Sequence, residues 1–121
     1  MNWKISTDRP VYLQLIEQIE QAIVAGQYPA GEKLPSVREL ATEAGVNPNT
    51  MLRALSELEN KGLVATQRTA GKSITVDVEK IKLLQEKLAT QQIVLFLQNM
   101  ANLGYSRTQA LALLEKMEES L

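Results

Sequence analysis

The sequence predicts a mainly α-helical fold in which three short helices and a β-hairpin are followed by a helical tail. Three segments that begin before residue 60 have apolar residues at helical spacing, and a glycine follows the end of each segment. The pattern then changes to two short β-prone runs and becomes helical again from Asp77. We therefore expect two regions, residues 1–76 and residues 77–121, with the boundary near Val76.

The composition excludes several classes of protein. The 121 residues contain no cysteine and no histidine, which excludes disulfides, imidazole bases and the zinc sites built from those ligands. We expect no enzyme, no cofactor and no metal site. No apolar run approaches the roughly 18 residues that span a bilayer, and the first residues lack a signal-peptide pattern, which predicts a cytoplasmic protein without a membrane partner. Because the formal net charge is −1, any positive surface for nucleic acid must be local.

The first helix is amphipathic. Thr7 or Asp8 is expected to cap it, Pro10 lies in the first turn, and Gly26 ends it. Its inner face has apolar residues at helical spacing: Val11, Leu15 and Ile19, with Ile16 and Ile23 beside them. The following stretch, QYPAGEKLP, is rich in proline and glycine and predicts a connector of turns.

Two further helices follow with a tight turn between them. Ser36 and Glu39 have the spacing of a capping box for the second helix, and Gly45 ends it. Asn47 is expected to cap the third helix, and Pro48 occupies its first position. The second helix has Val37, Leu40 and Ala41 on its inner face, and the third has Met51, Ala54, Leu55 and Leu58. Two short helices joined in this way predict a helix-turn-helix.

A β-hairpin is expected after the third helix. The runs LVATQ and SITV flank RTAGK, in which Gly71 can adopt a positive φ. The tip of this hairpin carries Arg68 and Lys72. Three helices followed by a hairpin are the arrangement of a winged helix-turn-helix.

The tail is predicted to form two helices with more apolar surface than they can bury. The run IVLFL at 93–97 is apolar on every side of a helix, and Ser106 with Gln109 forms a second capping box. The simplest cover is the same tail of a second chain, which predicts a homodimer. The expected dimerisation residues are Leu84, Leu88, Val94, Leu95, Phe96, Leu97, Ala101, Leu111 and Leu114.

A family resemblance covers residues 8–76. The stretch GEKLPSVRELATEAGVNPNTMLRALSELENKGLV resembles the signature of the GntR family of bacterial transcription regulators, and PVYLQLIEQIEQAIVAGQYPAG is similar to that family's first helix and connector. The resemblance implies a regulator that binds double-stranded DNA, and we expect a repressor that binds a near-palindromic operator as a homodimer. The short tail resembles the YtrA-type subfamily, whose two C-terminal helices are too few to enclose an effector cavity. The sequence identifies no small-molecule effector.

The sequence departs from that family pattern at two places. Several branches of the family have arginines where this chain has Pro48 and Leu52, and an arginine occurs instead at Arg53. The wing often contains G-x-G, whereas this chain has Gly71, Lys72 and Ser73. The operator sequence and the depth of the wing in DNA therefore do not transfer from those branches.

The expected DNA contacts come from the two helices of the motif and from the wing. Asparagine can bond adenine in the major groove, and threonine can bond phosphate or contact the thymine methyl, which favours Asn49 and Thr50. Arg53 either contacts guanine or phosphate, or pairs with Glu57 one turn later. The full set is Ser36, Arg38, Asn47, Asn49, Thr50, Arg53, Arg68, Gly71 and Lys72.

Each of these assignments has a structural alternative. Ser36 and Asn47 have sufficient reason to be present as helix caps, and Arg68 and Lys72 can be ordinary solubilising charges on a turn. The alternative function is a winged-helix module that binds proteins and uses its apolar tail to dock a partner. The near-neutral charge of the chain favours that alternative.

Overall fold

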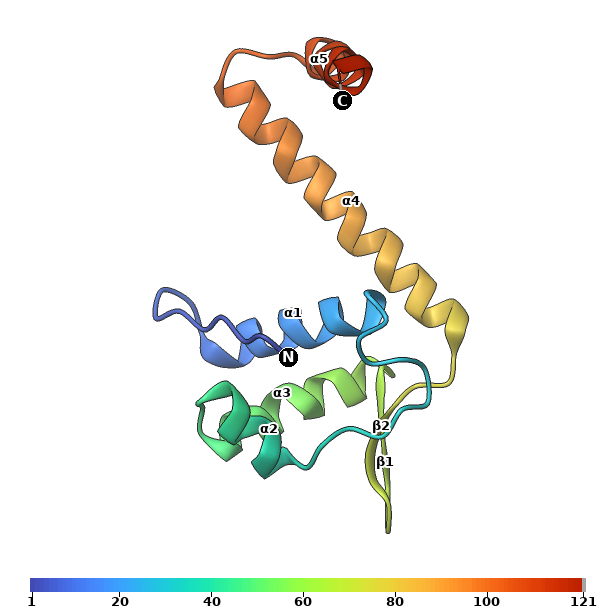
Figure 1. The fold of residues 1–121 in the computed structure, drawn as a ribbon. Coiled ribbons are helices and arrows are strands. Elements are labelled where there is room, and N and C mark those ends of the chain that lie inside the picture. Colours follow the sequence, from blue (N-terminus) through green and yellow to red (C-terminus); the bar gives the residue numbers. More distant parts are fainter. Residues whose placement is uncertain (121) are drawn as a thin grey trace. The chain divides into compact units, whose positions relative to one another are not determined.

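The computed structural model describes residues 1–120 and confirms the mainly α-helical fold with a hairpin (Figure 1). Two compact units are present, Met1–Gln85 and the unit that begins at Glu86. The helical tail starts at Val78, close to Val76, where the sequence pattern is expected to change from strand to helix. In chain order the elements are α1 (Val11–Val24), α2 (Val37–Ala44), α3 (Pro48–Asn60), β1 (Val64–Gln67), β2 (Gly71–Ile74), α4 (Val78–Asn102) and α5 (Arg107–Ser120).

The start of α1 differs from the sequence prediction. Pro10 occupies the N-cap position and provides no side-chain cap, so the prediction that Thr7 or Asp8 caps this helix is wrong. Asp8 accepts a hydrogen bond from the Ser6 hydroxyl instead. The Gln14 amide, in the first turn of α1, donates to the backbone oxygens of Ser6 (2.9 Å) and Arg9 (2.8 Å). The side chain of Gln14 thus holds the segment before α1 against the start of the helix. A search for residues that precede a helix and cap it does not detect such a contact.

The caps of α2 and α3 are confirmed. The Glu39 backbone N–H donates to Ser36 Oγ (3.1 Å), and Glu39 Oε1 accepts from the Ser36 N–H (3.2 Å), which completes the capping box. Gly45 ends α2 with a φ of 71°, a left-handed conformation that glycine adopts without steric cost. At α3, Asn47 Oδ1 accepts from the Asn49 N–H (2.8 Å), and Pro48 follows in the first helical position.

The hairpin forms as predicted and receives an additional backbone contact. Strands β1 and β2 are antiparallel, with Val64 opposite Ile74 and Gln67 opposite Gly71. The connector before α2, predicted only as turns, pairs with β2 through a bridge between Lys33 and Ser73. Backbone hydrogen bonds on either side of this bridge join β2 to the connector. Strand β2 is therefore hydrogen-bonded to β1 along one edge and to the connector along the other.

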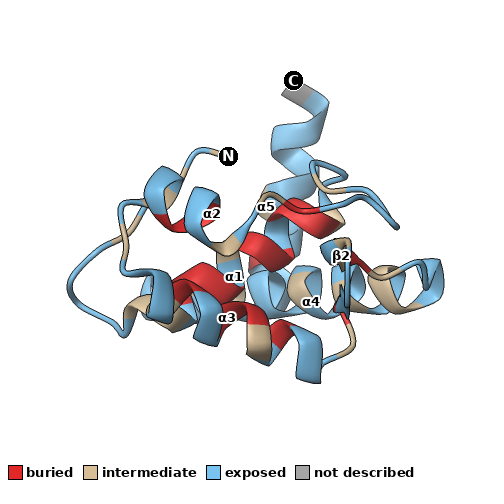
Figure 2. Ribbon diagram, turned by 90° about the horizontal axis from the view of Figure 1, so that it is seen from below, coloured by how far each residue is buried: buried red, intermediate tan, exposed pale blue. Residues whose placement is uncertain are grey.

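The first unit has one apolar core, to which every element from α1 to β2 contributes. Figure 2 shows the buried residues where the helices of this unit face one another. The predicted inner face of α3 is confirmed, since Met51, Ala54, Leu55 and Leu58 are all fully buried. They pack with Leu15 and Ile19 of α1 and Leu40 of α2.

The first two turns of α4 belong to this same unit. Ile81 and Leu84 are half-buried and pack against the core. Lys80 Nζ donates to the backbone oxygen of Lys61 (3.3 Å), just after the end of α3, and Gln85 Nε2 donates to that of Val24 (3.3 Å), at the end of α1. Both bonds satisfy carbonyl groups that a helix end leaves without an internal partner.

The second unit contains the rest of α4 and α5. The predicted capping box is confirmed, since the Ser106 N–H donates to Gln109 Oε1 (2.8 Å) and the Gln109 N–H donates to Ser106 Oγ (3.2 Å). Ala110 is buried, whereas Val94, Leu95, Leu111 and Leu114 are about half exposed. Within residues 1–120, no helix is long and apolar enough to cross a membrane.

Two leucines about one turn apart on α3 differ in burial, and this difference provides a test of the core. Leu55 has no exposed surface, whereas Leu52 is 44% exposed. We expect Leu55→Ala to lower the free energy of unfolding by about 2–5 kcal/mol, because it removes buried methyl groups and leaves a cavity. Leu52→Ala should change it by less than about 0.5 kcal/mol. Urea unfolding followed by circular dichroism measures both, and equal losses would contradict this packing.

Candidate nucleic-acid interface

The surface of α3 opposite the core carries the polar residues predicted to contact DNA. Because Met51, Ala54, Leu55 and Leu58 occupy the buried stripe, Asn49 and Arg53 point outward and are exposed, and Thr50 is half-buried beside them. Asn47 is exposed as well, but its side-chain oxygen is occupied by the Asn49 N–H. The helix therefore presents an amide, a hydroxyl and a guanidinium along its first two turns.

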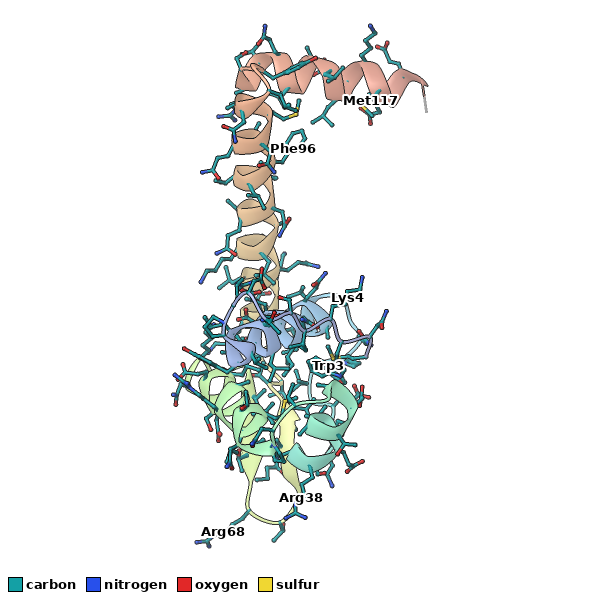
Figure 3. The ribbon with its side chains drawn as sticks, turned by 90° about the vertical axis from the view of Figure 1, so that its left-hand side faces the viewer. Trp3, Lys4, Arg38, Arg68, Phe96 and Met117 are labelled. Carbon is teal, nitrogen blue, oxygen red and sulfur yellow. The ribbon has the colours of Figure 1, made fainter. Side chains whose placement is uncertain are left out.

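The start of α2 and the wing border one groove. This groove has a volume of about 520 Å³, and Ser36, Thr66 and Arg68 are among its lining residues. Lys33 and Lys72 also line it, together with the acidic Glu39, so its positive charges come from the connector, the turn of the wing and β2. Arg38 and Arg68 are exposed and extend from the same end of the unit (Figure 3). A local positive surface thus exists in a chain whose formal net charge is −1.

Lys72 does not lie at the wing tip, where the sequence placed it. It lies in β2 opposite Thr66, and its Nζ donates to Thr66 Oγ1 (2.8 Å) and to Glu59 Oε2 (3.5 Å) near the end of α3. Its side chain is only 16% exposed. Lys72 therefore ties the wing to α3, whereas Arg68, in the turn, remains exposed.

The same contacts change the acidity of Glu59. Hydrogen bonds from Thr66 first, and then the charge of Lys72, hold the pKa of Glu59 below its ordinary value. A lowered pKa in the folded state means that this contact stabilises the fold above the unfolded-state pKa, and that the contribution is lost as the pH falls through the folded-state pKa.

Arg53 does not pair with Glu57, the alternative that its sequence spacing suggested. Its guanidinium carbon lies over the ring of Tyr12, 3.6 Å from the ring centroid. Tyr12 belongs to α1 and is half-buried against the core. The sequence gives no sign of this contact, because Tyr12 and Arg53 lie on different helices.

Together these features define a winged helix-turn-helix, a class of DNA-binding domain. A capped second helix leads through a glycine turn to a third helix with an outward polar face, and a hairpin with a basic tip lies beside them.

The chain belongs to the family of bacterial regulatory proteins called the gntR family, whose model matches residues 11–76. It is 37% identical to the HTH-type transcriptional regulator YhcF of Bacillus subtilis (strain 168) over 92% of each chain. It is 39% identical to the HTH-type transcriptional repressor YtrA of the same organism over 65% of each chain. It is thus a DNA-binding transcription regulator.

Solved structures show the same likeness. A GntR family transcriptional regulator from Listeria monocytogenes matches with a TM-score of 0.85 and 39% identity, over 93% of this chain and 98% of the other. The N-terminal domain of AraR, in a crystal structure with mutant ORR3, matches with a TM-score of 0.54 and 27% identity, over 58% of this chain and 100% of the other.

The contact between the wing and α3 can be tested by titration. Thr66→Val keeps the size of the side chain but removes the hydroxyl, so we expect the pKa of Glu59 to rise toward its ordinary value. Thr69→Val, in the turn of the wing, is the matched control and should leave it unchanged. NMR titration of the Glu59 carboxyl carbon measures both. An unchanged pKa in Thr66→Val would show that Glu59 does not receive this hydrogen bond.

Proposed function

We propose that this chain is a transcriptional repressor that binds a near-palindromic operator as a homodimer, in the cytoplasm where the bacterial chromosome lies. The observation that carries this proposal is the outward polar face of α3, with Asn49 and Arg53 exposed and the wing beside it. In proteins of this class that helix enters the major groove. A two-fold dimer then reads two half-sites about one helical turn apart.

Within this proposal the residues divide into two groups by the chemistry they offer. Asn49, Thr50 and Arg53 lie on α3 and read base edges. Ser36 and Arg38, at the start of α2, and Arg68, in the wing, contact the phosphate backbone and fix the register of the protein.

The remaining predicted DNA contacts have a supporting role in this proposal. Asn47 caps α3, Gly71 shapes the wing with a φ of 78°, and Lys72 holds the wing against α3. Each of these residues holds a neighbouring group in position. In particular, the contact between Lys72 and Glu59 holds the wing against α3, and Arg68 reaches the DNA backbone from this wing.

Repression is favoured by the role of a relative. YtrA of Bacillus subtilis, which is 39% identical, is a transcriptional repressor. A small dimer that occupies its operator can repress simply by excluding other proteins from that DNA.

The second unit supports the homodimer. Val94, Leu95, Leu111 and Leu114 keep 47–51% of their surface exposed, and Phe96 keeps 37%. Large apolar side chains exposed in this number favour an interaction site, and two-fold homodimers are the commonest soluble oligomers. Leu84, which the sequence grouped with these residues, packs against the core of the first unit, so we place the dimer surface from Leu88 onward.

The alternative function remains a protein-binding module. The same exposed apolar residues of the second unit support it, because they fit a different partner protein as well as a second copy. The mass in solution distinguishes the two. A protein that stays monomeric at micromolar concentration and shows no preference among DNA sequences would favour the protein-binding module.

DNA readout is tested by selecting bound sequences from random duplexes at two salt concentrations, with the whole chain. We expect an enriched near-palindrome and an affinity that falls with salt, because phosphate contacts release counterions. Arg53→Ala should reduce the preference for the selected operator over random DNA by about 1–3 kcal/mol.

The matched control is Arg68→Ala, which also removes one exposed arginine. It should weaken binding to all sequences similarly and lower the slope of log affinity against log salt by about one. Equal losses of preference in the two variants would contradict the division of roles. The absence of any enriched palindrome would rule out the operator proposed here.

The dimer is tested with two single variants, each of which introduces a glutamate at an exposed site of α4. Leu95→Glu places a charge within the proposed dimer surface, and we expect it to shift the protein from dimer to monomer in analytical ultracentrifugation. Val78→Glu is the control, because Val78 is 66% exposed but lies at the start of α4, outside that surface. A wild-type protein that sediments as a monomer, or a Leu95→Glu variant that remains dimeric, would contradict the proposed interface.

A further inference from the structure

The contact between Tyr12 and Arg53 joins the first helix to the outward face of α3. The guanidinium carbon of Arg53 lies 3.6 Å from the ring centroid of Tyr12, which is van der Waals contact between two flat groups. The Tyr12 ring is half-buried and packs against the hydrophobic core, whereas Arg53 is exposed. A fixed ring therefore supports a side chain that otherwise extends into solvent.

With its carbon 3.6 Å from the ring centroid, the guanidinium has room only to lie nearly flat on the ring, so the contact occupies its face and leaves its edge free. The N–H donors of arginine lie in the plane of the group, so stacking does not consume them. Among the hydrogen bonds and ion pairs within residues 1–120, none involves the side chain of Arg53, and Glu57 one turn later does not pair with it. The donors of Arg53 remain available to a ligand while its plane is held.

We propose that Tyr12 is a positioning residue for DNA readout: its ring holds the guanidinium of Arg53 in place before DNA binds. This inference rests on the proposed function, in which Arg53 contacts the operator. Arginine has several rotatable bonds, and ordering such a side chain on binding opposes association. A side chain that is already ordered loses less freedom when the complex forms.

The positioning acts on specificity more than on general affinity. An arginine that contacts guanine does so through two parallel hydrogen bonds, which require one orientation of its plane. A phosphate in random DNA accepts hydrogen bonds from many directions and is attracted mainly by charge. Removing the ring of Tyr12 should therefore weaken binding to the operator and leave binding to random duplexes nearly unchanged.

The test compares Tyr12→Leu with Tyr12→Phe in the whole chain, using the operator obtained by selection and a random duplex of equal length. Leucine keeps an apolar group against the core but removes the ring, and we expect a three- to tenfold loss of operator affinity. Phenylalanine keeps the ring and should bind like the wild type. Thermal unfolding of each variant checks that the fold is intact.

A double variant separates positioning from a general structural effect. In the Arg53→Ala background, Tyr12→Leu should cause no further loss of operator affinity, because the group that it positions is absent. An equal loss in both backgrounds would overturn the proposal, since Tyr12 would then act through the fold. Loss of the folded state in Tyr12→Leu together with weak operator binding by Tyr12→Phe would overturn it as well.

An NMR measurement without DNA tests the contact itself. The Arg53 Nε–H proton lies near an aromatic ring and should show a ring-current shift that Tyr12→Phe retains and Tyr12→Leu abolishes. An unchanged shift in Tyr12→Leu would overturn the positioning role. If the shift disappears as expected but Arg53→Ala binds the operator like the wild type, the assignment of Arg53 to the DNA contact fails and the inference fails with it.

Discussion

The burial of one apolar stripe of α3 against α1 is the interaction on which the rest of the first unit depends. Met51, Leu55 and Leu58 are fully buried, and this fixes the rotation of α3 about its own axis. Since helical residues occupy fixed angles, the same rotation directs Asn49 and Arg53 outward. The outward polar face of α3 is therefore a consequence of the core, and a substitution that alters the packing of α3 also alters which side chains that face presents.

Polar contacts then place the other surfaces around this helix. Lys72 ties β2 to Glu59 on α3, and the bridge between Lys33 and Ser73 ties β2 to the connector before α2. Lys80 and Gln85 attach the start of α4 to the ends of α3 and α1. Each contact links neighbouring elements through polar groups at the edge of the core. The wing, α3 and the first turns of α4 are therefore held together in the first unit.

The near-neutral charge of the chain is compatible with binding DNA because charge acts locally. Acidic partners neutralise some lysines, as Glu59 does for Lys72 and Glu20 for Lys61. Arg38 and Arg68 have no such partner among the ion pairs within residues 1–120 and are exposed at the same end of the first unit (Figure 3). Counting charges along the sequence therefore underestimates the positive surface, which depends on which cations remain unpaired.

The sequence by itself determined the elements and the polar face of α3. The capping boxes of α2 and α5, the cap at Asn47 and the apolar stripe of α3 are local patterns, because their residues lie within one or two helical turns. Only the tertiary structure decided that Arg53 rests on Tyr12 and that Lys72 holds the wing. These contacts join separate elements, and their geometry follows from packing across the core, which no spacing along the chain encodes.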